Sequence, residues 1–144
     1  MSTLFTIGYE RATQPEVIAR LQDAGVATLI DVRAVAASRR AGFAKSLLAA
    51  GLAEAAIGYV HLRELGTPKA GREAAKAGRV AEMQAIFAAH MATPEAEAGL
   101  ARAIAIAREG PVCLLCLEAE AHRCHRAIVA RMMRRQMKCE VVDL

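Results

Sequence analysis

Residue types that support nucleophilic, acid–base or metal chemistry gather near the end of the chain. Cys116 and Glu118 close an apolar run, and Cys124, His125 and Arg126 follow shortly after. A cysteine thiolate is a nucleophile and a metal ligand, and a glutamate serves as general acid or base. An arginine holds a phosphate or carboxylate with two parallel bonds. The stretch therefore predicts a reactive site, with Glu118, Cys124 and Cys116 as candidate catalytic residues.

Cys124 has two interpretations that the sequence leaves open. A helix is expected over residues 123–136, which places Cys124 in its first turn, where free N–H groups and the helix dipole favour a thiolate. Alternatively, Cys124 begins an apolar stripe toward Ile128 and simply packs. Glu118 is similarly open, because it can act as a general base, orient Arg33 or serve only the structure.

A metal site is the less favoured interpretation of the cysteines. Cys113 and Cys116 are an odd number of residues apart on an expected strand, so their thiols point to opposite faces, whereas zinc ligands must converge. Cys113 is expected in the core. His122, Cys124 and His125 form at most a partial metal site with Cys116, and we expect no metal and no cofactor.

Arg33 directly follows a second apolar strand that contains Asp31. Asp31 either anchors Arg33 for ligand binding or forms a purely structural ion pair with it. Ser38 is the favoured ligand in the polar loop that follows, whereas His61, in the middle of an expected strand, is interpreted as structural.

The elements that position these residues alternate along the chain. A strand and a helix recur in turn, and this order indicates a mostly parallel five-stranded sheet with helices on both faces, in one three-layer α/β domain over residues 1–144. Residues 66–72, which contain Gly66, Pro68 and Gly71, are expected as a loop. The expected strands are 4–7, 26–32, 58–62, 112–117 and 140–143, and the expected helices are 13–24, 43–56, 80–91, 94–108 and 123–136.

Parallel strands end at one edge of a sheet, where ligands of open α/β folds bind. The residues after the strand ends are therefore expected to meet. Arg33 and Arg126 should line one hollow and hold an anion with the start of the last helix. The expected ligand-binding residues are Gly8, Tyr9, Arg33, Ser38, His125 and Arg126.

The composition of the chain limits the classes of partner that we expect it to bind. The net charge of +4 and the aromatic content of 3% permit an anionic ligand but fall short of a basic, aromatic nucleic-acid footprint. A small anionic ligand is expected, nucleic acid is possible but not favoured, and no membrane partner is expected. The N-terminal residues lack a signal-peptide pattern, so we expect a cytoplasmic protein whose four cysteines are reduced thiols.

Several motifs resemble the domain of unknown function 488 family, whose members are typically small bacterial and archaeal proteins without an established reaction. The resemblance supports the fold and the site without supplying a chemistry. Two positions depart from the family pattern: Tyr9 and Glu10 stand where the first motif often has His-Ser, and Ala36 replaces a proline that often precedes the serine. The matching segments are 7–9, 29–33 with Ser38, 42–43, 59–62 with 65–66, 116–118 and 124–126.

A more distant similarity concerns the rhodaneses. The strand around Asp31-Val32-Arg33 and the apolar strand that ends at Cys116 resemble theirs, which would make Cys116 a persulfide carrier. Glu118 and Glu120 would, however, repel thiosulfate. The leading hypothesis is therefore an enzyme-like site for a phosphorylated or nucleotide-like anion. A rhodanese-like sulfurtransferase and a nucleic-acid-binding module are the alternatives.

Overall fold

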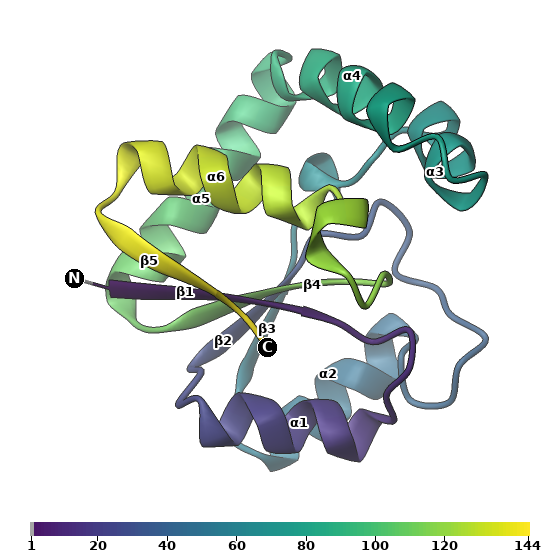
Figure 1. Ribbon diagram of the computed structural model, residues 1–144. Coiled ribbons are helices and arrows are strands. Elements are labelled where there is room, and N and C mark those ends of the chain that lie inside the picture. Colours follow the sequence, from purple (N-terminus) through teal and green to yellow (C-terminus); the bar gives the residue numbers. More distant parts are fainter. Residues whose placement is uncertain (1) are drawn as a thin grey trace.

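The computed structural model describes residues 2–144 and contains one sheet of five strands, all parallel (Figure 1). The strand order is β3-β2-β4-β1-β5. The predicted parallel sheet is therefore confirmed. The strands are β1 (Ser2–Gly8), β2 (Thr28–Asp31), β3 (Gly58–His61), β4 (Val112–Cys116) and β5 (Cys139–Asp143).

Helices cover both faces of this sheet, as predicted (Figure 1). Two helices pack on one face, and the later four lie on the opposite side. The helices are α1 (Gln14–Asp23), α2 (Lys45–Glu54), α3 (Lys69–Lys76), α4 (Val80–Met91), α5 (Pro94–Glu109) and α6 (Arg126–Gln136), with short 3-10 helices η1 (Arg63–Leu65) and η2 (Ala121–Arg123). The domain therefore has three layers, with the sheet between two layers of helices.

The two faces of β4 belong to different cores. Cys113 and Leu115 pack with α1 and α2, whereas Leu114 and Cys116 pack with α4, α5 and α6. Successive side chains of a strand point to opposite faces. The alternation thus confirms that Cys113 is a buried core residue and that its thiol and that of Cys116 lie on opposite sides of the sheet.

Local signals determine several helix ends. Thr13 and Glu16 form a capping box at the start of α1, with each side chain bonded to the other residue's backbone N–H. Thr93 caps α5, and Pro94 occupies the first turn of that helix. These contacts satisfy N–H groups that lack partners within the helix.

The expected loop at 66–72 is wrong in its second half, because α3 begins at Lys69. Pro68 lies just before the helix, where a proline is tolerated. Gly71 lies inside this helix, at a position where a Cβ atom would lie 2.2 Å from Cγ2 of Thr67. This glycine therefore permits close packing rather than a turn, which the sequence pattern does not distinguish.

The start of the last helix also differs from the prediction. Residues 121–123 form η2, Cys124 has an extended backbone with φ −121° and ψ 144°, and α6 begins at Arg126. Cys124 is therefore not in the first turn of α6. The thiolate stabilisation by that helix N-terminus, expected from the sequence, does not apply to it.

The connections create a crevice between two neighbouring strands. β2 pairs with β4, but the chain leaves β2 toward α2 on one face and leaves β4 toward α6 on the other. Such a reversal opens a gap at the carboxyl edge of a parallel sheet. Within residues 2–144, no helix combines the length and apolarity needed to span a membrane.

Candidate functional site

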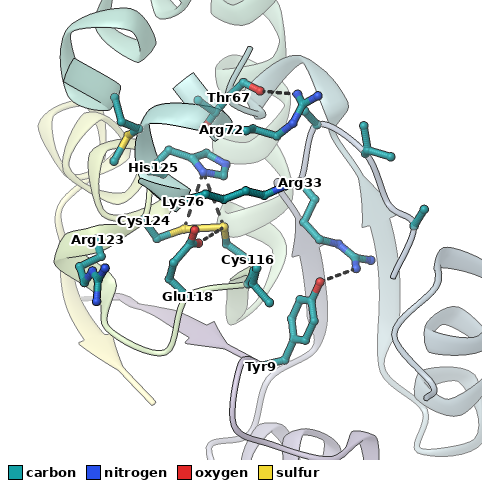
Figure 2. Close-up of a pocket in the computed structure, with 16 residues that line it drawn as sticks. Tyr9, Arg33, Thr67, Arg72, Lys76, Cys116, Glu118, Arg123, Cys124 and His125 are labelled. Atoms are coloured by element: carbon teal, nitrogen blue, oxygen red, sulfur yellow. Dashed lines mark hydrogen bonds between the residues drawn. A yellow bond between two sulfur atoms is a disulfide. The ribbon is translucent and has the colours of Figure 1, made fainter. Parts of the chain in front are cut away.

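A pocket of about 220 Å³ lies at this crevice (Figure 2). Five segments that are distant in sequence form its wall: the residue after β1, the loop after β2, Thr67 with α3, one residue of α4, and the end of β4 with the turn that follows. The polar and sulfur-containing side chains of the wall are Tyr9, Arg33, Thr67, Arg72, Lys76, Met83, Cys116, Glu118, Arg123, Cys124 and His125.

Arg33 lies in the pocket wall and forms a buried ion pair with Asp31. Its Nη2 is 2.7 Å and its Nε 2.9 Å from the two carboxylate oxygens of Asp31, which also accepts the hydroxyl of Tyr59 at 2.6 Å. Burial alone would lower the pKa of Arg33, but the hydrogen bonds and the charge of Asp31 raise it. Arg33 therefore stays charged.

Most of the Arg33 donors are already used. Nη1 donates to the hydroxyl of Tyr9 at 3.1 Å and to the carbonyl of Phe43 at 2.8 Å. A guanidinium has five N–H groups, so within residues 2–144 only one N–H, on Nη2, is left for a ligand. Most contacts of Asp31 and Arg33 are therefore those of a structural ion pair. Tyr9 helps to orient the Arg33 guanidinium by accepting one of its N–H groups.

Cys116 and Cys124 form a disulfide at the floor of the pocket. All four cysteines were expected as reduced thiols. In the structure this pair is bonded, whereas Cys113 and Cys139 are free. The sequence separation of eight residues is bridged because η2 returns the chain to the end of β4. The bond brings together the two cysteines that the sequence proposed as separate catalytic candidates.

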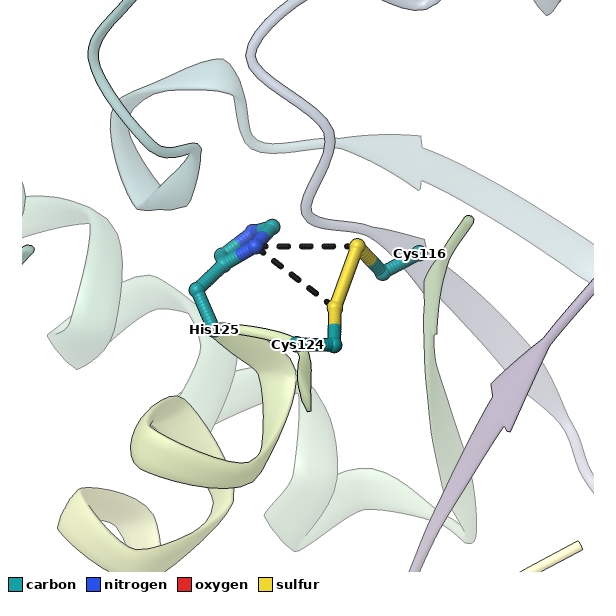
Figure 3. Close-up of side chains that lie close together, drawn as sticks. All are labelled: Cys116, Cys124 and His125. Atoms are coloured by element: carbon teal, nitrogen blue, oxygen red, sulfur yellow. Dashed lines mark hydrogen bonds between the residues drawn. A yellow bond between two sulfur atoms is a disulfide. The ribbon is translucent and has the colours of Figure 1, made fainter. Parts of the chain in front are cut away.

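His125 lies beside both sulfur atoms (Figure 3). Its Nδ1 is 3.6 Å from Sγ of Cys116 and 3.6 Å from Sγ of Cys124. Its Nε2 lies 2.6 Å from the carbonyl oxygen of Val32. A carbonyl only accepts, so Nε2 carries the hydrogen and the lone pair of Nδ1 faces the sulfurs.

The ring of His125 is neutral at physiological pH. Burial lowers its pKa to about 4, although the bond to Val32 acts in the opposite direction. The edge of the ring contacts Phe87, with 5.1 Å between the ring centroids. His125 thus presents a neutral lone pair to the cysteines and is not a cationic ligand.

Glu118 lines the same pocket and lies close to the sulfur of Cys116. Its Oε2 is 3.3 Å from that Sγ atom. Burial raises the pKa of the Glu118 carboxyl, while Arg126 and Arg123 partly offset the effect. A carboxyl with a raised pKa is suited to proton transfer at neutral pH.

Arg126 does not share the pocket with Arg33. Its side chain is fully buried, and its Nη1 and Nη2 donate to the carbonyls of Glu118 and Ala119 at 2.5 and 3.3 Å. Burial lowers its pKa, and its Nε has no hydrogen-bond partner in the described chain. The expected pairing of two arginines in one hollow is therefore wrong, because Arg126 is enclosed beneath the loop after β4 and fixes that loop.

Gly8 and Ser38 are also outside the pocket. A Cβ atom on Gly8 would lie within 2 Å of the Glu118 carbonyl oxygen, so this glycine lets the loop pass over β1. Glu10 supports the same loop by accepting the N–H of Ala119 at 3.2 Å. Ser38 accepts the N–H of Arg40 at 3.1 Å, which stabilises a turn in the loop after β2.

Three cationic side chains of the pocket were not among the predicted site residues. Arg72 and Lys76 lie on α3, which was expected in part as a loop, and Arg123 is the last residue of η2. Their spacing of four residues places Arg72 and Lys76 on one helix face. With Arg33, they give the pocket four cationic side chains against one carboxylate, that of Glu118.

Fold and site together define a three-layer α/β protein with a cysteine-containing, cation-lined pocket at the carboxyl edge of its sheet. The sequence model of the family described as Domain of unknown function DUF488 matches residues 13–133, and the chain belongs to this family. The matched span includes the β2 loop, α3 and the cysteine pair, and leaves out β1 and β5. No curated protein and no solved structure matches the chain.

Proposed function

We propose that the pocket binds a small phosphorylated or nucleotide-like anion and performs chemistry on it with Cys116 and Glu118. The observation that carries this proposal is the convergence of Arg72, Lys76 and Arg123 on the pocket that contains Cys116. These cations come from two separate elements, α3 and η2. Charges of one sign that line a concave surface attract ligands of the opposite sign.

The three cations have donors to spare. Lys76 and Arg123 are exposed, and their side chains make no hydrogen bond or ion pair within residues 2–144. Arg72 donates Nη1 to the Thr67 carbonyl at 2.8 Å, which positions the guanidinium and leaves Nε and Nη2 available. In this proposal Arg72, Lys76 and Arg123 are the primary anion ligands, and Arg33 adds its one remaining N–H.

The reactive groups lie on the floor beneath these cations. In the reduced protein, Glu118, whose Oε2 lies 3.3 Å from Sγ of Cys116, accepts the thiol proton, and the thiolate is the nucleophile. Glu118 exchanges protons with the bound ligand, consistent with its raised pKa. We place this chemistry in the cytoplasm of a bacterial or archaeal cell, where the reducing environment keeps the two thiols free.

Calorimetric titration with inorganic phosphate, pyrophosphate and a nucleoside monophosphate tests the proposal. Lys76→Ala should weaken binding of the best of these anions about tenfold, as expected for loss of one charge-assisted bond of about 1.5 kcal/mol. Lys69→Ala is the matched control, since Lys69 is exposed on the same helix and outside the pocket. Equal losses in both variants, or no anion binding by the wild type, would overturn the proposal.

A second candidate function is sulfur transfer through Cys116. The supporting observation is that Cys124 lies within bonding distance of Cys116, at the end of β4. The Cys116 thiolate would take the outer sulfur of thiosulfate, release sulfite and become a persulfide. Cyanide would then remove that sulfur as thiocyanate, and Cys124 would otherwise resolve the persulfide by forming the disulfide and releasing hydrogen sulfide.

Thiocyanate production distinguishes this candidate. The reduced wild type should form thiocyanate from thiosulfate and cyanide, Cys116→Ser should form none, and Cys113→Ser should retain the activity because Cys113 faces the other core. If the reduced wild type forms no thiocyanate with several sulfane donors, the protein is not a sulfurtransferase. The proposed anion site is unaffected by that result, because calorimetry tests it separately.

A further inference from the structure

We propose that the reduced protein binds a zinc ion through Cys116, Cys124 and His125. The three ligand atoms, the two Sγ atoms and Nδ1, all lie within 4.8 Å of one another. Two thiolates and an imidazole are a common zinc ligand set, with bonds of about 2.3 Å to sulfur and about 2.0 Å to nitrogen. This site goes beyond the proposed anion binding and does not depend on it. While the ion is bound, Cys116 is a metal ligand, so it acts as the free nucleophile of the proposed function only in the reduced, metal-free protein.

The histidine is already oriented as a metal ligand. Its Nε2–H donates to the Val32 carbonyl at 2.6 Å, so the Nδ1 lone pair points at the two sulfurs (Figure 3). Metal-binding histidines commonly donate their second N–H to a backbone carbonyl or carboxylate, which fixes the tautomer. Phe87 holds the ring from its edge. The observation is independent of the cysteines and indicates the same ion position.

The backbone permits the cysteines to separate around an ion. The Cα atoms of Cys116 and Cys124 are 7.1 Å apart, so the two side chains reach toward each other across the gap. Once the S–S bond is reduced, rotation about the Cα–Cβ bonds moves the sulfurs apart without moving the strand or η2. The space between the sulfurs and Nδ1 then accommodates the metal.

Three protein ligands leave the fourth position of a tetrahedral zinc open. All three ligands line the pocket, so this position faces its interior, next to Glu118. Zinc sites with three protein ligands and an open position are characteristic of catalytic rather than structural zinc. Two thiolates neutralise the ion, and Arg33, Arg72 and Lys76 then favour an anion or hydroxide in the open position.

The disulfide and the metal exclude each other. When hydrogen peroxide oxidises the site, the two thiolates lose two electrons and form the S–S bond, and the peroxide O–O bond breaks. Two protons from solvent complete two water molecules, and the zinc ion is released because its sulfur ligands no longer carry charge. The oxidised protein is therefore a natural control that needs no substitution.

The experiment is an anaerobic titration of the reduced chain of residues 1–144 with Co²⁺ and then Zn²⁺. One cobalt should bind with the absorption of a tetrahedral thiolate complex, and zinc should displace it stoichiometrically. Cys116→Ser, Cys124→Ser and His125→Ala should each lose more than about 100-fold in zinc affinity, beyond the effect of an outer contact. Cys113→Ser and His122→Ala should retain the wild-type affinity, because Cys113 faces the other core and His122 is exposed outside the pocket.

Several results would overturn the site. Equal metal binding by the oxidised and reduced wild type would do so, as would a cobalt spectrum without thiolate bands or an unchanged affinity in Cys116→Ser. Circular dichroism identifies any variant that fails to fold, and the oxidised wild type keeps the comparison valid in that case. Phosphate titration of the metal-free protein tests the anion site separately. Phosphate binding without metal binding would overturn only the zinc site, and metal binding without phosphate binding would overturn only the anion site.

Discussion

The carboxylate of Asp31 accepts both the backbone N–H and the side chain of Arg33, two residues further along the chain. The backbone bond is 3.1 Å and the closest side-chain contact is 2.7 Å, and both residues are almost fully buried. This pair lies at the end of β2 and holds Arg33 in the pocket wall. It also bonds to Tyr9, the residue after β1, and to Tyr59 of β3, so it connects the ends of three strands.

Arg33→Ala should lower the free energy of unfolding by about 3 kcal/mol, because it leaves the buried Asp31 carboxylate without its counter-charge. Urea denaturation followed by circular dichroism measures this loss. Arg39→Ala is the control, since Arg39 is exposed in the same loop and makes no side-chain bond within the described chain. If both substitutions left the unfolding midpoint unchanged, the Asp31–Arg33 pair would not stabilise the fold.

Gly8→Ala should destabilise the protein by about 1–3 kcal/mol, the usual range for overpacking, because the new methyl group would collide with the Glu118 carbonyl. The displaced loop carries Glu118 and Arg123, so anion affinity should fall as well. Gly110→Ala offers a comparison, because its Cβ would meet only the Ala27 side chain at 3.3 Å. Thermal unfolding and phosphate titration of both variants give the result, and wild-type behaviour of Gly8→Ala would contradict the close contact.

The stability of the oxidised protein should depend on His125 below neutral pH. The fold holds the ring neutral, with the pKa lowered from 6.5 to about 4, so the unfolded chain takes up the proton first as the pH falls. The contribution of His125 to the free energy of unfolding is therefore complete above pH 6.5 and is lost as the pH falls to 4. The total loss is about 3 kcal/mol.

His125→Gln provides the reference for that measurement, because glutamine can donate to Val32 and does not titrate. The stability difference between wild type and variant should shrink from pH 6.5 to pH 4, while the opposite effect of Glu118 is common to both proteins. A difference that stays constant over this range would show that the ring is not held neutral by the fold.

The sheet was predictable because its strands are short apolar runs that alternate with helices. The helices expected from residues 13 and 94 do begin there, and strand alternation correctly separated Cys113 from Cys116. α3 was missed because Gly71 normally indicates a turn, and here it serves close packing against Thr67. Missing this helix also meant missing Arg72 and Lys76.

The site was predicted only in part. Arg33, Cys116, Glu118, Cys124 and His125 do meet at the carboxyl edge, because parallel strands end together. The position of Arg126 could not be predicted, since a Cys-His-Arg motif is compatible with an arginine that faces a ligand or one that bonds to backbone carbonyls. The structure shows the second arrangement, with both bonds directed to the loop after β4.

The anion site can be tested most directly with a crystal structure of the protein grown with tungstate, a heavy analogue of phosphate. We predict an anomalous peak in the pocket, within hydrogen-bonding distance of Lys76 and Arg72 and above the sulfur of Cys116. A pocket without a peak, at tungstate concentrations that saturate binding in solution, would contradict the proposed function.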